Sequence, residues 1–216
     1  MFNTAGKVVL PIRTLVYYKA EKPPLSFIKA TVPLPRGLKM IAGYDMISNA
    51  QGTGVTWMCV NMQGSSITGG KTIINCPSGM DVRAKVAFPD CWDGVNIDTS
   101  NHRSHMTYSI FSGSPTASHC PASHPIHIPE ITVQVDYPND GNSQNWRLSS
   151  DMSGQLNGAS LHADWWGGWD EDIMKKWLNN CLYGLKTSNL GQLCDKTRLL
   201  NRDMFNGPYV VEPPAR

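Results

Sequence analysis

Residues 81–88, DVRAKVAF, and residues 130–137, EITVQVDY, decide the fold class of this chain. In both stretches every second side chain is apolar: Val82, Ala84, Val86 and Phe88 in the first, and Ile131, Val133, Val135 and Tyr137 in the second. Alternation with a period of two residues is typical of a strand that buries one face. The two stretches therefore predict two β-strands that line a hydrophobic core.

Weaker strand patterns occur along much of the chain, each bounded by Gly, Pro, Asn or Ser. They cover residues 8–10, 14–18, 38–42, 55–60, 106–111 and 145–148. Many short strands separated by turn residues predict a mainly β fold, either an antiparallel β-sandwich or a jelly roll.

One segment near the C-terminus has helical periodicity. Ile173, Trp177 and Cys181 recur at intervals of four residues. Asp170 is a suitable N-cap and Gly184 a suitable end. We expect a single C-terminal α-helix that packs on the sheet.

Length and charge limit the function classes. The 216 residues, 41% of them hydrophobic, fit a single domain spanning residues 1–216. A formal net charge of +2 with 17% charged residues gives no field that would gather nucleic acid. No apolar run is long enough to span a membrane.

Six cysteines are spread along the chain without the close pairs of a zinc site, so we expect disulfides. Pairing of sequence neighbours is favoured among the 15 possible connectivities. It gives Cys59–Cys76, Cys91–Cys120 and Cys181–Cys194. Disulfides indicate an oxidising, extracellular compartment. The N-terminal segment MFNTAGKVVLPIR lacks the features of an export signal, so we expect processing or a longer precursor.

Histidines are concentrated in one region: five of the six lie between residues 102 and 127. His102 and His105 form an H-x-x-H pair in NHRSHM, and His162 with Asp164 lies in SLHADWW. Histidine ligates metals and transfers protons near neutral pH. We predict that His102, His105 and His162 converge in a catalytic centre that also has the ligands for a divalent metal ion.

A simpler interpretation of the pair stays open, in which one histidine caps a turn and the other packs beneath the loop. His119, His124 and His127 surround Cys120 and two prolines, and we expect them to be structural.

The segment PDCWDGVNID, residues 89–98, places Asp90, Asp93 and Asp98 around Trp92 and Asn96. Such carboxylates could orient a histidine or act as acid and base. Alternatively, Asp93 and Gly94 simply form a turn.

Trp165, Trp166 and Trp169 lie close together before the predicted helix. An exposed tryptophan offers a flat apolar face to a sugar ring, and we expect at least one of the three to lie in the core. The residues predicted to bind substrate are Trp92, Asn96, Arg103, Trp165 and Trp166.

Three further segments carry a family resemblance. They are PSGMDVRAKVAFPDCWDGVNIDTSNHRSHMTY at 77–108, CPASHPIHIPEITVQVDYP at 120–138 and LHADWWGGWDEDIMKKWLNNC at 161–181. Their F-P-x-C-W-D-G-V-N, H-x-S-H-M, C-P-x-x-H-P and late H-x-D motifs resemble the domain of unknown function 1996 family over residues 12–181. Residues 182–216 would then be a C-terminal extension.

The resemblance implies a secreted protein of a fungal and bacterial family that is often joined to modules binding cell-wall carbohydrate. It also implies a His-x-His pair upstream of residues 14–18. This sequence has no such pair, so we expect an incomplete family site.

Two function classes follow. The first is an extracellular carbohydrate-active enzyme, a hydrolase or lyase of wall or matrix polysaccharide. In it the histidines would transfer protons, with Asp93 or Asp164 orienting them. The alternative is a non-catalytic component of the matrix that binds glycan, or one that has a structural role through self-association.

Overall fold

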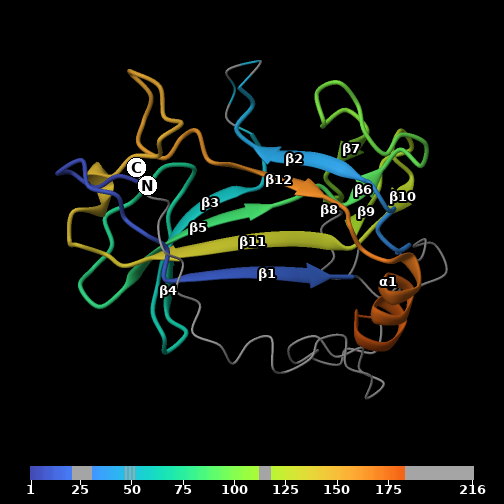
Figure 1. Cartoon of the computed structure of the whole chain (residues 1–216), viewed down its shortest axis with the longest axis horizontal. Coiled ribbons are helices and arrows are strands. Elements are labelled where there is room, and N and C mark those ends of the chain that lie inside the picture. Colours follow the sequence, from blue (N-terminus) through green and yellow to red (C-terminus); the bar gives the residue numbers. More distant parts are fainter. Residues whose placement is uncertain (21–30, 47, 49, 51, 112–117, 183–216) are drawn as a thin grey trace, which may run out of the picture.

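The computed structural model describes residues 1–20, 31–46, 48, 50, 52–111 and 118–182. Its largest element is an antiparallel sheet of five strands in the order β1, β11, β5, β3 and β4 (Figure 1). These strands are β1 (Arg13–Lys19), β11 (Glu130–Tyr137), β5 (Asp81–Ala87), β3 (Val55–Val60) and β4 (Ser66–Thr68). The two strongest predicted strands, β5 and β11, are neighbours at its centre. The prediction of a mainly β, antiparallel fold is confirmed.

A second layer lies along one face of this sheet. It is the antiparallel pair of β2 (Lys39–Gly43) and β12 (His162–Trp166), which crosses above β5 and β11 in Figure 1. The apolar side chains between the layers form the main core: Met40 and Ala42 from β2, Val55, Val86 and Ile131 from the large sheet, and Ala163 and Trp165 from β12. This two-layer packing is consistent with the predicted sandwich.

Short strands close one end of the molecule. β10 (Ile126–His127), β6 (Cys91–Trp92) and β7 (Met106–Thr107) form a three-stranded sheet, and β8 (Ile110–Phe111) pairs with β9 (Ser118–His119). A second core at the other end is built around the fully buried Trp57 and Trp146, the latter next to the 3-10 turn Ser143–Asn145.

The predicted helix is confirmed as α1 (Glu171–Trp177), which continues into a π-helical turn, Leu178–Leu182. Its N-cap is Asp170, whose carboxylate accepts hydrogen bonds from the backbone N–H groups of Asp172 and Ile173. Gly184, the predicted end, lies outside the described residues.

Two predicted strands are wrong and a third is divided. Residues 8–10 form no strand, because Val8 and Leu10 are exposed and only Val8 makes a bridge, to Phe2. Residues 145–148 hold the buried Trp146 and one bridge from Arg147 to Phe2. The buried Trp146 accounts for the apolar pattern of this segment, which does not pair with a neighbouring strand. Residues 106–111 form β7 and β8 with a break between them.

The predicted disulfides Cys59–Cys76 and Cys91–Cys120 are confirmed. No cysteine in the described ranges is free. The third predicted pair, Cys181–Cys194, includes a residue outside those ranges.

No helix in the described part of the chain has the length and apolar character that a membrane span requires.

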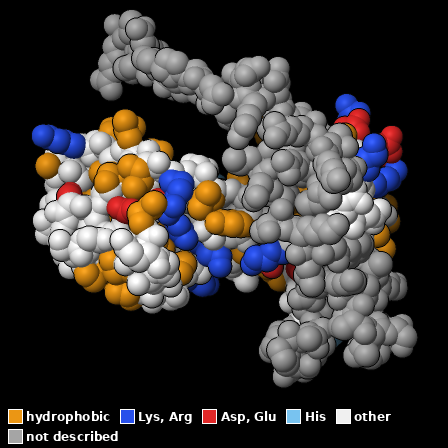
Figure 2. Space-filling view, turned by 90° about the horizontal axis from the view of Figure 1, so that it is seen from below, with side chains coloured by type: hydrophobic (Ala, Val, Ile, Leu, Met, Phe, Trp, Pro, Cys, Tyr) orange, Lys and Arg blue, Asp and Glu red, His pale blue; other side chains and the backbone are white. Residues whose placement is uncertain are grey.

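The outward face of the large sheet carries a buried ionic cluster. Asp136, only 1% exposed, accepts from Arg13 on β1 and Arg83 on β5, each at an N–O distance of 2.6 Å. Burial alone would raise the pKa of Asp136, but the hydrogen bonds from the two guanidinium groups outweigh it and hold the pKa below its usual range. Figure 2 shows Lys and Arg side chains, in blue, along the face seen from below.

Candidate functional site

The loop of residues 97–105 lies against the edge of β2 that does not pair with β12. The backbone N–H of Lys39 donates to the Ile97 carbonyl and that of Ile41 to the His102 carbonyl, both at 2.9 Å. β2 is therefore flanked by β12 on one side and by the histidine-bearing loop on the other.

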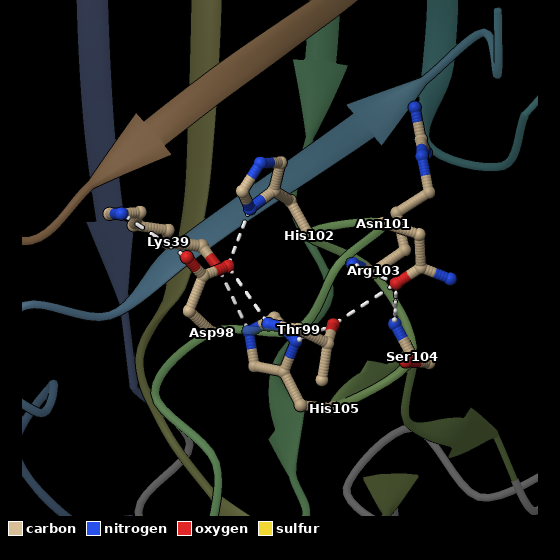
Figure 3. Close-up of polar contacts among 8 residues, drawn as sticks. All are labelled: Lys39, Asp98, Thr99, Asn101, His102, Arg103, Ser104 and His105. Atoms are coloured by element: carbon tan, nitrogen blue, oxygen red, sulfur yellow. Dashed lines mark hydrogen bonds and ion pairs between the residues drawn. The ribbon is translucent and has the colours of Figure 1, made fainter. Parts of the chain in front are cut away.

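His102, Asp98 and Lys39 form a linked polar group at this edge (Figure 3). Asp98 Oδ1 lies 2.5 Å from His102 Nδ1, and Asp98 Oδ2 lies 3.2 Å from Lys39 Nζ. The hydrogen bond from His102, followed by that from Lys39, lowers the pKa of Asp98. His102 has a left-handed backbone with φ of 52°, which is unusual for a residue other than glycine. Its side chain is 39% exposed, so the imidazole is accessible.

His105 lies beneath this group and is completely buried. Its Nε2 donates to the Lys39 carbonyl at 2.8 Å, and its Nδ1 lies 3.0 Å from the Thr99 hydroxyl. Burial lowers the pKa of His105 and so favours the neutral ring, and the Thr99 hydroxyl beside Nδ1 donates to the Asn101 side-chain oxygen at 3.0 Å. With both nitrogens engaged and no exposed surface, His105 positions the loop against β2. Its predicted role in catalysis and metal ligation stays a prediction.

The loop itself is held by Asn101, whose side-chain oxygen accepts from the backbone N–H groups of Arg103 and Ser104 at 3.0 and 2.9 Å. This Asx-type turn directs Arg103 towards the end of β2. Arg103 Nη1 donates to the carbonyls of Ile41 and Gly43, and Nη2 donates to that of Tyr44.

β12 presents alternate side chains on the outer side of the second layer. His162, Asp164 and Trp166 lie opposite Gly43, Ile41 and Lys39 of β2, and directly opposed residues of an antiparallel pair point to the same face. Trp166 is 72% exposed. Lys39 Nζ lies 5.9 Å from the centre of its ring, within cation–π range.

Gly43 permits the close approach of the two strands at this end. Its φ is +88°, and a Cβ there would lie 2.4 Å from the Leu161 carbonyl oxygen. Only glycine fits this position. The half-buried and exposed residues of this layer and its border with the loop are named the β2–β12 face: Lys39, Ile41, His162, Asp164, Trp166, Asp98 and His102.

His162 is not brought together with the other two predicted histidines. β2 lies between β12 and the loop, which separates their backbones by about 10 Å, twice the usual strand spacing. His162 Nδ1 donates to the Ser160 carbonyl at 2.8 Å. Within the described ranges, no three His, Cys, Asp or Glu side chains are arranged as metal ligands. The predicted three-histidine ligand set is thus not assembled.

Asp93 and Asn96 form a turn, the simpler of the two interpretations. Asp93 accepts from the backbone N–H groups of Val95 and Asn96 and from the Asn96 side chain, and Gly94 has φ of +82°. Burial would raise the pKa of Asp93, but these hydrogen bonds outweigh it and lower the pKa. Trp92 Nε1 donates to the Asn96 carbonyl at 2.6 Å, which ties the tryptophan to the same turn.

The other tryptophans and one more histidine are structural. Trp165 and Trp169 pack edge-on against Tyr18, as expected for core members of the aromatic segment. His127 is buried with Nε2 2.9 Å from Asp90, in agreement with its predicted structural role.

Lys39 is the site residue that the sequence analysis missed. The sequence does not show which strand pairs with residues 162–166, even though their period-two pattern indicates a strand. Lys39 joins the site only because β2 is that partner. Asp98 was noted, yet no spacing rule pairs it with His102 across a left-handed turn.

The comparisons with known proteins give one match. The family model described as Domain of unknown function (DUF1996) matches residues 3–169, which confirms the predicted resemblance. No curated protein and no solved structure matches the chain.

Proposed function

Since this chain belongs to the Domain of unknown function (DUF1996) family, whose name assigns no activity, we propose from its residues that it binds glycan outside the cell through the β2–β12 face. The observation that carries the proposal is Trp166, a tryptophan left 72% exposed at the end of β12. A flat aromatic surface of this kind suits the apolar face of a sugar ring.

Polar groups around the ring support the same function. Lys39 lies beside Trp166, and the Asp98–His102 pair lies beside Lys39. Together they provide charged donors and acceptors at the edge of an aromatic platform, which is what sugar hydroxyls require. The two disulfides agree with an extracellular location, in which such glycans occur.

Retention on insoluble chitin, cellulose and β-glucan tests this function. Trp166→Ala should weaken binding at least about tenfold, because an aromatic anchor is lost. It should change the free energy of unfolding by less than about 0.5 kcal/mol, because the side chain is exposed. Tyr17→Ala, which removes an exposed aromatic residue from β1, is the matched control and should bind normally. Equal retention of the Trp166 and Tyr17 variants would refute the proposal.

A second candidate function is proton transfer by His102. The specific observation is the 2.5 Å hydrogen bond that His102 Nδ1 donates to Asp98, which orients the imidazole of an exposed residue in a strained backbone conformation. Among the described residues His102 Nε2 has no hydrogen-bond partner, so it is available to a substrate. If the protein cleaves glycan, His102→Asn should abolish turnover while retention on the same glycan persists.

A further inference from the structure

We propose that a pocket at the end of β2 binds the carboxylate group of an acidic sugar, so that the glycan bound is one containing uronic acid. This inference rests on the glycan binding proposed above and deepens it by naming the class of glycan.

The pocket opens where β2 meets the segment after Arg103. Its volume is about 180 Å³, and its lining includes Arg103, Thr53 and Thr107 together with Ile41 and Gly43 of β2. At about 30 Å³ per water molecule, this is room for roughly six waters, enough to admit a ring substituent.

Arg103 supplies a positive charge that no carboxylate balances within the described part of the chain. By contrast, Arg13 and Arg83 share the carboxylate of Asp136. The three hydrogen bonds of Arg103 go to neutral carbonyls, from both hydrogens of Nη1 and one of Nη2. A guanidinium group has five N–H donors, so Nε–H and one N–H of Nη2 are left. A planar fork of this kind pairs with a carboxylate through two parallel hydrogen bonds.

The remaining lining suits a sugar that carries this carboxylate. Thr53 and Thr107 provide hydroxyl groups for ring hydroxyls, and Ile41 and Met106 provide apolar contact for the ring carbons. The hydroxyl of Tyr108 is already committed, because it donates to the carbonyls of Thr53 and Ala87 at 3.0 and 2.9 Å. Burial raises the pKa of Tyr108 to about 12, so it adds no negative charge that would repel the ligand.

The pocket is continuous with the β2–β12 face. Ile41 belongs to both, and Lys39 and Gly43 are separated by about 13 Å along the strand at the usual rise of 3.3 Å per residue. A glycan chain stacked on Trp166 beside Lys39 can therefore follow β2 to Arg103. It would meet a positive charge at each end of this path, with the carboxylate of Asp98 already paired to Lys39 and His102.

Calorimetric titration of the whole protein with three matched oligosaccharides tests the inference. They are trigalacturonate, the same trimer with its carboxyl groups reduced to alcohols, and a sulfated galactose trimer. Trigalacturonate should bind at least about tenfold more tightly than the reduced trimer, since a hydrogen-bonded ion pair is lost. Its affinity should fall as salt is raised from 50 to 500 mM, whereas that of the reduced trimer should not.

Two variants locate the effect. Arg103→Gln removes the charge and should abolish the preference for the acidic trimer, while Arg103→Lys keeps the charge and should retain part of it. Because both substitutions change the contacts of Arg103 at the end of β2, Thr107→Val is added as a variant that leaves the three carbonyl contacts intact. It should weaken trigalacturonate binding but not the binding of Trp166-dependent neutral β-glucan.

The outcomes separate this inference from the function on which it rests. Equal binding of the acidic and reduced trimers, both lost in Trp166→Ala, would overturn the carboxylate site and leave glycan binding standing. Stronger binding of the sulfated trimer would overturn the uronate assignment. If no glycan binds to the wild-type protein, the proposed function fails and the inference fails with it.

Discussion

At the scale of single residues, His105 shows how burial changes what a histidine does. It was grouped with His102 because both lie in NHRSHM, yet His105 is 0% exposed and His102 is accessible. The hydrogen bonds of His105 to Thr99 and to the Lys39 carbonyl hold the loop that carries His102 against β2. The H-x-x-H pair therefore consists of one exposed ring and one internal support.

The lowered pKa of His105 predicts a pH-dependent stability. In the unfolded chain the imidazole is protonated below about pH 6.5, whereas the folded protein keeps it neutral to a lower pH. The unfolded state then binds more protons, so this contribution is complete above about pH 6.5 and is lost progressively as the pH falls from that value through the lower pKa of the folded state. Urea unfolding at intervals between pH 7 and pH 5 should show this decline.

His105→Gln tests the origin of the decline, because glutamine has a donor and an acceptor but does not titrate. This variant should be less stable at pH 7 and should show a flatter dependence on pH. His119→Gln, at an exposed histidine, is the control and should keep the wild-type slope. An unchanged slope in His105→Gln would assign the dependence to another group. Asp98 and Asp93 do not affect the slope between pH 7 and pH 5. Their pKa values are lowered, so their contributions to stability are lost only at more acidic pH.

At the scale of elements, the pairing of β2 with β12 creates the candidate site. The sequence of β12 alternates as a strand should, with Ala163 and Trp165 in the core and Asp164 and Trp166 outside. From the sequence alone this stretch resembles an aromatic segment leading to the helix, because Gly167 and Gly168 follow it and three tryptophans obscure a five-residue pattern. Short strands are difficult to recognise when their partner is more than one hundred residues away.

Gly43→Ala should uncouple this pair. A left-handed backbone costs about 1–2 kcal/mol for alanine, and the added Cβ would meet backbone atoms of Leu161 and His162. We expect a loss of more than about 2 kcal/mol in the free energy of unfolding, together with weaker glycan retention. Gly168→Ala, where a Cβ meets nothing within 4 Å, should change neither quantity. Wild-type stability of Gly43→Ala would show that the strand junction adapts.

At the scale of the whole molecule, the two described disulfides have different tasks. Cys59–Cys76 lies in the core around Trp57, far along the sheet from the β2–β12 face. In the second disulfide, Cys91–Cys120, Cys91 is the first residue of β6. This strand pairs with β7 and β10 and leads into the loop that carries Asp98 and His102. The second disulfide therefore supports the candidate site as well as the fold.

Double Cys→Ala variants should separate stability from binding. For sequence separations of 17 and 29 residues, loop entropy predicts losses of about 3 and about 3.5 kcal/mol for the first and second disulfide. Only the Cys91/Cys120 variant should also bind glycan more weakly when measured at a temperature where both remain folded. Equal binding by the two variants would contradict this division. Intact mass before and after reduction, with one hydrogen gained for each of the six cysteines, reports whether all are paired.

The sequence alone determined the class of fold and its covalent links. The alternation of Val82 to Phe88 and of Ile131 to Tyr137 is a local property, since a strand with one buried face needs an apolar residue at every second position. The same holds for the Asp170 cap and for the turn at Asp93 and Gly94, whose contacts are made within a few residues. Pairing of the first four cysteines followed from their order along a meandering β chain.

Only the tertiary structure decided which of these residues share a surface. Lys39, Trp166, Asp98 and His102 come from three separate segments, and they meet because β2 pairs with β12 on one edge and with the loop on the other. The same packing buries His105, which no local pattern distinguishes from its accessible neighbour His102. Burial and long-range strand pairing depend on the whole chain, because each segment gains its buried face only from a partner distant in sequence.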